Sequence, residues 1–197
     1  MTRTIINLAC PGCGARVSTG QEKCEYCGGP IMITTLESVQ SLSTAEANKY
    51  TVAYRKALAE NPGNRELNAS LAACYLRLKL YDKAIAALED AMEDNLDNPE
   101  IFFLAAACLL RGQKAFVARR PDVDKILDYL NAAIMIEPRG IYHYFLAYVK
   151  HDYFRRKYLN ISPDHVEEYH AALELGVSED EIQRLFSTLG VERPGEL

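Results

Sequence analysis

The 197-residue sequence lacks a long apolar run, a secretory leader and an excess of basic residues. No stretch is apolar for long enough to span a bilayer, and residues 1–8 contain one Arg and too short an apolar run for a signal peptide. The formal net charge of −5 argues against general nucleic-acid binding. We therefore expect a cytoplasmic protein that has no membrane contact.

Motifs of common enzyme classes are also missing. The chain has no nucleophile elbow, no phosphate-binding loop and no paired-carboxylate pattern. His165 and His170 are five residues apart, and His143 and His151 are eight apart. Neither pair has the spacing of three or four residues that puts two side chains on one face of a helix. We expect a protein that is not an enzyme.

Cysteine is present, and it is arranged in pairs. Four of the six cysteines form two C-x-x-C motifs, Cys10 with Cys13 and Cys24 with Cys27, and a glycine follows each motif. In a reducing compartment, paired motifs of this kind favour a metal ion over disulfide bonds. Four thiolates make a closed tetrahedral site, which suits one structural Zn²⁺ and leaves no position for a substrate.

Two alternatives to zinc stay open at this point, a redox dithiol and a four-Cys iron site of rubredoxin type. A redox motif needs only one pair and a βαβ setting, which the sequence lacks. The two motifs resemble a zinc ribbon, which implies flanking strands over residues 4–8 and 30–34 in a domain over residues 1–35. Two roles are open for this ribbon. In the first, the metal only stabilises the fold of the ribbon; in the second, the ribbon also serves as a docking surface for a partner.

The clearest internal pattern lies in residues 64–99, where small and large apolar side chains fall at the positions where two helices meet. These positions are Leu71, Ala72, Tyr75, Tyr81, Ala84, Leu88 and Ala91. The stretch resembles a tetratricopeptide (TPR) repeat, a helical pair that needs stacked neighbours to bury its apolar face. The resemblance covers about residues 45–175. It implies a mainly α fold, a TPR-like helical-repeat solenoid with a small N-terminal β zinc ribbon.

Caps, prolines and glycines place the other helices. Residues 36–45 are expected to be a linker or a poorly formed first helix. Helical repeats and C-terminal capping helices follow over 46–190, and 191–197 is a frayed tail. Pro121 is expected to stop one long helix and Asp122 or Asp124 to cap the next. The remaining expected helices cover 46–59, 65–78, 82–94, 99–119, 141–159, 163–175 and 178–190.

In TPR proteins the first helices of successive repeats line a concave groove, so the resemblance implies which side chains face a partner. The groove implied here consists of Arg77, Phe102, Leu109, Phe145, Val149 and Tyr153. An apolar helix or an extended segment of a protein partner fits such a groove, and so does a second copy of the chain. The other alternative is coverage by the chain's own segment 36–45 or its C-terminal helix.

Residues 111–120 and 150–157 are basic in an otherwise acidic chain. The candidate basic patch consists of Arg111, Lys114, Arg119, Arg120, Lys150, Arg155, Arg156 and Lys157. Basic side chains interleaved with aromatic ones, here Tyr153 and Tyr158, are able to bind nucleic acid. In an acidic repeat protein the same residues also serve as a solvated face or contact an acidic partner.

These features support three functional hypotheses. The leading one is a non-enzymatic intracellular adaptor or scaffold, which binds a protein through the TPR groove and uses the structural zinc ribbon as a second docking surface. The alternative is a nucleic-acid-associated factor that uses the ribbon and the two basic stretches. The third is a regulatory subunit of an enzyme complex.

Overall fold

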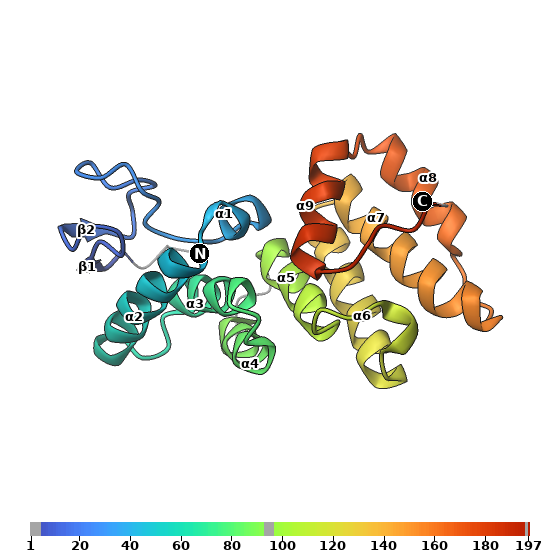
Figure 1. Ribbon diagram of the computed structural model, residues 1–197, viewed down its shortest axis with the longest axis horizontal. Helices are drawn as coiled ribbons and strands as arrows, with labels where there is room; N and C mark the ends of the chain where they lie inside the picture. The colour runs from blue at the N-terminus through green and yellow to red at the C-terminus, as the bar shows by residue number, and fades with distance from the viewer. Residues whose placement is uncertain (1–4, 93–96, 196) are drawn as a thin grey trace. The chain divides into compact units, whose positions relative to one another are not determined.

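A computed structural model describes residues 5–92, 97–195 and 197. Most of these residues are helical, and their only sheet is one short hairpin, so the mainly α prediction is confirmed. The chain divides into two compact units, Met1–Leu96 and Asp97–Leu197 (Figure 1). Within the described residues, every helix is too short or too polar to cross a bilayer.

The first unit begins with the cysteine-bearing hairpin and continues with helices. Its elements are β1 (Asn7–Ala9), β2 (Arg16–Ser18), α1 (Leu36–Ser41), α2 (Thr44–Glu60), α3 (Arg65–Arg77) and α4 (Tyr81–Met92). The predicted pair over 65–78 and 82–94 is confirmed by α3 and α4, although residues 93 and 94 lie outside the described residues. α3 packs against both α2 and α4, and its small Ala72 is fully buried.

The strands of the ribbon differ from the prediction. β1 begins at Asn7 and pairs antiparallel with β2, not with residues 30–34; residue 4 lies outside the described residues. Within 30–34, the described contacts include one isolated bridge, between Pro30 and Lys23. β1 and β2 can close locally because only the first cysteine motif and its turn separate them, which is enough for an antiparallel hairpin.

Residues 30–34 instead join the ribbon to α2. Ile31 and Ile33 are fully buried. The hydroxyl of Tyr54 donates to the carbonyl oxygen of Ile31 at 2.7 Å. The hydroxyl of Tyr50 donates to the carbonyl oxygen of Pro30, also at 2.7 Å. The ribbon therefore shares packing with the helices of the first unit, which extends from Met1 to Leu96.

Residues 36–45, expected to be a linker or a poorly formed helix, contain the short helix α1. Thr35 caps it in a capping box with Ser38, and α1 buries Leu36 and Val39 while packing against α3. Ser43 then caps α2 in a capping box with Glu46.

The second unit is built from α-helices interrupted by shorter helical turns. Its elements are α5 (Pro99–Leu109), the 3₁₀ turn Ala115–Val117, α6 (Arg120–Ile136), α7 (Gly140–Val149), the π-helix Lys150–Phe154, the 3₁₀ turn Arg155–Lys157, α8 (His165–Glu174) and α9 (Glu179–Leu189). α5 is buried on every side from Ile101 to Leu109, as its apolar sequence predicts. α5 packs against α6, and α7 packs against α8.

The predicted helix over 99–119 is wrong beyond Leu109. Arg111 and Gly112 have φ angles of 52° and 72°, which a right-handed helix does not contain. Pro121 does not stop a helix either, because it lies in the first turn of α6, whose N-cap is Arg119. A proline in the first turn lacks only an N–H that would have no partner within the helix.

The predicted helix over 141–159 changes its hydrogen-bonding pattern midway. α7 ends at Val149, the π-helix and a 3₁₀ turn carry the chain to Lys157, and Tyr158 adopts a left-handed conformation with φ of 57°. The helix predicted over 163–175 begins slightly later than expected, because Asp164 caps α8. The helix predicted over 178–190 is confirmed by α9, which Ser178 opens in a capping box with Glu181.

Candidate functional site

The four cysteines of the two C-x-x-C motifs come together in the structure. Their sulfur atoms all lie within 4.8 Å of one another. The Sγ atoms of Cys10 and Cys27 are 3.6 Å apart, and those of Cys13 and Cys24 are 3.7 Å apart. Sulfur atoms placed tetrahedrally at a Zn–S distance of about 2.3 Å are about 3.8 Å apart. The four thiols are therefore able to hold one metal ion in tetrahedral geometry.

The backbone of each motif forms the same turn. The N–H of Gly14 donates to the carbonyl of Cys10, and the N–H of Gly28 donates to that of Cys24, both at 2.8 Å. Both glycines have positive φ, 81° and 70°, a conformation that glycine adopts at little cost. The glycine after each motif thus lets the chain fold back around the sulfurs.

The turn around the second motif favours a thiolate at Cys24. A backbone hydrogen bond from Cys27 lowers the pKa of the Cys24 thiol to about 7. The pKa of Cys27 responds first to the amide of Gly29, which lowers it, but the neighbouring Cys10 thiol and desolvation outweigh that contact and raise the pKa to about 12. Four sulfurs this close cannot all ionise easily without a cation, and thiolates are the form that binds metal.

The residues of the predicted groove are not an open surface in this structure. Five of the six are buried: Phe102, Leu109, Phe145, Val149 and Tyr153. The sixth, Arg77, is partly exposed, and its Nε donates to the carbonyl oxygen of Leu42, just beyond α1, at 2.6 Å. The expectation of solvent-facing apolar side chains is therefore corrected, because they form part of the core.

The chain's own C-terminal helix covers α7. α9 packs against α5 and α7 (Figure 1). The ring of Phe186 on α9 meets the rings of Tyr144 and Tyr148 edge-on, with centroids 6.3 and 5.1 Å apart. This arrangement matches the self-coverage alternative, in which the C-terminal helix fills the space that a partner would need.

The candidate basic patch is partly neutralised by nearby carboxylates. Arg119 contacts Asp122 at 2.9 Å, and Arg120 contacts Asp124 at 2.8 Å, each within the first turn of α6 or next to it. The stretch from 111 to 120 therefore presents less unbalanced positive charge than its sequence suggests. In the other basic stretch, Lys157 lies over the ring of Tyr153, with its Nζ 3.6 Å from the centroid.

A buried ionic network at the end of α7 was missed by sequence reasoning. The Nζ of Lys150 donates to Glu168 at 2.6 Å and to the carbonyl of Pro163 at 2.8 Å. The second carboxylate oxygen of Glu168 lies 2.7 Å from Nδ1 of His143. Lys150 and Glu168 are both buried, so Lys150 is not part of a surface patch. The seven-residue separation of His143 and Lys150, which puts both on one helix face, was the available signal.

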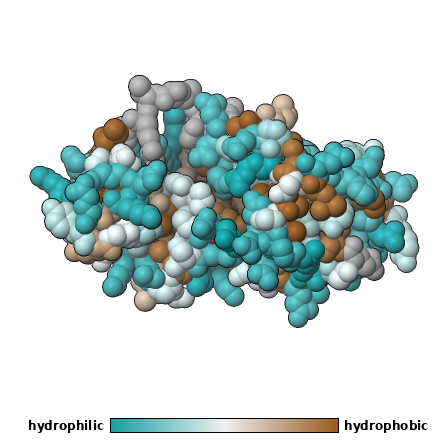
Figure 2. All heavy atoms as spheres, turned by 90° about the horizontal axis from the view of Figure 1, so that it is seen from above, coloured by the Kyte–Doolittle hydropathy of each residue, from teal (hydrophilic) through white to brown (hydrophobic). Residues whose placement is uncertain are grey.

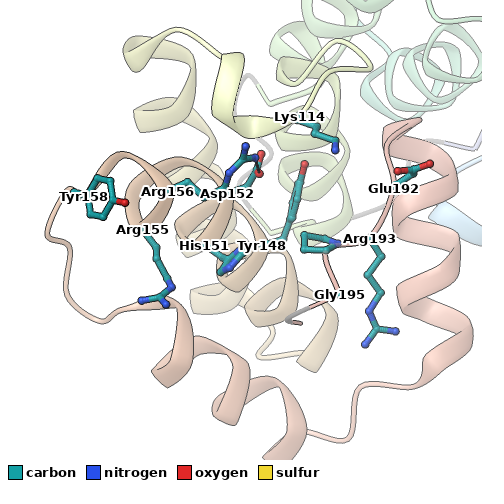
Figure 3. Close-up of a pocket in the computed structure, with 11 residues that line it drawn as sticks. Lys114, Tyr148, His151, Asp152, Arg155, Arg156, Tyr158, Glu192, Arg193 and Gly195 are labelled. Carbon is teal, nitrogen blue, oxygen red and sulfur yellow. Dashed lines mark hydrogen bonds and ion pairs between the residues drawn. The ribbon is translucent and has the colours of Figure 1, made fainter.

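Lys114, Arg155 and Arg156, which come from the two separate basic stretches, line one cavity in the second unit (Figure 3). The cavity has a volume of about 540 Å³. The further lining residues with acidic, basic or imidazole side chains are His151, Asp152, Glu192 and Arg193, and Tyr148 and Tyr158 add phenol groups. The segment 192–195, expected to be part of a frayed tail, forms one wall, so the cavity combines segments that are distant in sequence.

Asp152 holds the inner wall of this cavity. One of its carboxylate oxygens accepts the N–H of Phe116 at 2.8 Å, and the other accepts from Arg156 at 2.5 Å. The guanidinium of Arg156 also lies 4.3 Å from the ring centroid of Phe116. These contacts tie the π-helix to the 3₁₀ turn at 115–117. π-Helical turns of this kind occur often at functional sites.

Comparison with known proteins supports the repeat assignment. Residues 45–111 match the family described as tetratricopeptide repeat, which confirms the resemblance over α2 to α5. Among solved structures, a chain named MamA MSR-1 C2 is similar, with 21% identity and a TM-score of 0.49 over 75% of this chain and 84% of that chain. No curated protein matches the chain significantly.

Proposed function

We propose that this chain, which carries tetratricopeptide repeats over residues 45–111, is a non-enzymatic adaptor that binds a protein partner. The repeat match is the observation that carries the proposal, because stacked helical repeats are built to present extended binding surfaces. The chain shows none of the catalytic motifs considered above, and the contacts described for its buried charged groups are internal ion pairs.

The proposal includes one structural Zn²⁺ bound by Cys10, Cys13, Cys24 and Cys27. The sulfur separations and the all-thiolate donor set support zinc, and a closed four-ligand site stabilises a fold without offering an open position for chemistry. The four metal–sulfur bonds would stabilise a ribbon whose own sheet is one short hairpin, and thiols kept reduced for metal binding are typical of a cytoplasmic protein.

Elemental analysis of protein purified without added metal tests the zinc site. We expect about one zinc ion per chain and its loss in the Cys10→Ser/Cys24→Ser variant. The matched control replaces the two buried helical cysteines, Cys74→Ser and Cys108→Ser, and keeps its zinc if it folds. Iron in place of zinc, or zinc retained by the first variant, contradicts the assignment.

The outer face of α8 is the partner surface that we propose in the second unit, since α9 already covers α7. Large hydrophobic side chains are exposed along this part of the chain; they are Tyr158, Leu159, Val166, Leu173 and Leu175. Val166 and Leu173 are seven residues apart and therefore lie on one face of α8. On the face that Figure 2 shows, hydrophilic residues predominate and hydrophobic ones appear in separate patches.

The ribbon supplies the second proposed docking surface. Tyr26 lies between the two cysteines of the second motif, and 78% of its surface is exposed. An aromatic side chain held on a rigid, metal-bound turn gives large contact area with little loss of conformational freedom, and tyrosine is enriched at protein interfaces.

Affinity capture with the full chain tests the adaptor role. The baits are the natural chain, Val166→Ser/Leu173→Ser, Tyr26→Ser and a control, Val52→Ser/Met135→Ser, which alters two apolar side chains elsewhere that are even more exposed than those of α8. We expect a protein retained in near-equal amounts by the natural chain and the control, and lost from the α8 variant. If no protein is retained at that level, or if all four baits retain the same proteins, the proposal is contradicted.

A further inference from the structure

The cavity between the π-helix and the C-terminal segment is positively charged in an acidic protein. Four cationic side chains line it, and two carboxylates oppose them, which leaves a formal charge of +2 with His151 neutral. The whole chain has a formal charge of −5. A local excess of this sign in a concave site favours an anionic ligand and increases its local concentration.

The cations of the cavity differ in how they are held. Arg156 is fixed by Asp152 at 2.5 Å, and Arg193 contacts Glu179 at 2.8 Å. Lys114 and Arg155 are exposed at the lining, and they lie 41 residues apart in the sequence. The site thus combines oriented guanidinium groups with two exposed cations, which Figure 3 shows on separate segments.

We propose that this cavity binds a phosphate monoester. A phosphate monoester carries a charge of about −1.5 to −2 at neutral pH, which balances the formal charge of the lining. Arginine forms paired hydrogen bonds with phosphate oxygens, and lysine adds a compact charge. The volume of about 540 Å³ is larger than a phosphate group needs and leaves room for the group that carries it.

Nucleic acid fits the described charges less well. A nucleic-acid strand requires a continuous row of cations that follows its phosphates. Arg119 and Arg120 are paired with aspartates, and Lys150 is buried against Glu168, so these three do not extend the cavity into such a row. The cations that line the cavity surround a single space, which suits one phosphate group. This inference does not depend on the adaptor role.

Calorimetric titration of the full chain in phosphate-free buffer tests the proposal. The probes are inorganic phosphate, O-phosphoserine, a phosphoserine peptide of otherwise neutral residues, its unphosphorylated form and a short single-stranded oligonucleotide. We expect the phosphorylated peptide to bind and the unphosphorylated one not to bind. Equal binding of O-phosphoserine identifies a small phosphorylated molecule as a sufficient ligand, and binding of the phosphopeptide alone identifies a phosphorylated protein segment; both results support the proposal.

Variants locate the binding. Lys114→Gln/Arg155→Gln removes the two exposed cations and should weaken phosphopeptide binding about tenfold or more, since hydrogen bonds to charged groups are the strong ones. Arg155→Lys keeps the charge and should lose less. The matched control, Lys49→Gln/Arg55→Gln, removes the same charge from the exposed side of α2 and should bind normally. A thermal melt confirms that each variant is folded.

The proposal is overturned by any of three results. The first is that no phosphorylated probe binds. The second is that the control variant weakens binding as much as the cavity variant does, which indicates a general charge effect. The third is that the oligonucleotide binds as tightly as the phosphopeptide and loses its affinity in the same cavity variant.

Discussion

The two units bury different kinds of polar side chains. Among the described residues, and apart from tyrosine and cysteine, the buried polar residues of the first unit are Thr19, Thr51 and Ser70, which carry hydroxyls. Those of the second unit are ionisable; they are Lys150, His151, Asp152 and Glu168. A hydroxyl has only one hydrogen to donate, whereas a buried charge needs several partners from different segments.

This difference follows the regularity of the helices. In the first unit, α2, α3 and α4 are uninterrupted, and their contacts come from apolar side chains at repeat spacing. In the second unit, α7 passes into a π-helix whose five residues are all buried, three of them with ionisable polar side chains. The irregular turn is therefore where the chain departs from a plain repeat, and the same turn forms the wall of the cavity.

Replacing two apolar residues of the second unit should have the largest effect. Leu109→Gln/Phe145→Gln puts two amides into a buried core, and we expect a loss of about 5 kcal/mol or more in the free energy of unfolding. Thermal and urea unfolding measure it. Met135→Gln, at an exposed position, should change stability by no more than about 0.5 kcal/mol. Unchanged stability of the double variant would mean that the predicted groove is open after all.

Breaking the buried ionic network should have the next largest effect. Glu168→Gln leaves Lys150 without its charged partner, and we expect a loss of about 3–5 kcal/mol, because the lysine stays buried. The comparison is Arg120→Gln, which removes an exposed pair and should cost about 0–1 kcal/mol. Similar losses of stability from the two substitutions would contradict the view that the buried ion pair matters more for stability than the exposed one.

A buried hydroxyl of the first unit should matter least. The hydroxyl of Thr51 donates to the carbonyl of Ala47 at 2.8 Å, one turn earlier in α2. Thr51→Val keeps the shape of the side chain, and that carbonyl also accepts within the helix, so we expect a loss of about 1 kcal/mol or less. A loss as large as that of Glu168→Gln in urea unfolding would remove the contrast between the two units.

The sequence predicted the elements that depend on local patterns. Helical spacing and caps placed α3, α4 and α9 to within about two residues, in line with the usual accuracy of helix ends. The paired cysteines indicated the four-cysteine cluster that could hold a metal ion, because their chemistry and spacing are local. The predicted strand over 30–34 was wrong. The conformation of this segment depends on the burial of Ile31 and Ile33 against the helices, and a local sequence pattern does not reveal that burial.

The second unit was harder to predict for the same reason. The break after Leu109 depends on the left-handed Arg111 and Gly112, and the π-helix depends on where Asp152 finds its partners. Asp152 has one partner close in sequence, Arg156, and one that is 36 positions away, Phe116. Sequence spacing gives no sign of the distant partner. The cavity is lined by both predicted basic stretches and by the C-terminal segment. The distribution of charge along the sequence does not reveal that these segments lie close together in space.

Hydrogen–deuterium exchange of the full chain, with and without a metal chelator, tests the central claim that a bound metal organises the cysteine ribbon of a helical-repeat adaptor. The amides of Cys10, Gly14 and Gly28 make the hydrogen bonds of the two turns. The account predicts that these amides exchange much faster once metal is removed, while those of α6 to α9 keep their protection. Unchanged protection of the ribbon amides, or an equal loss across both units, would contradict it.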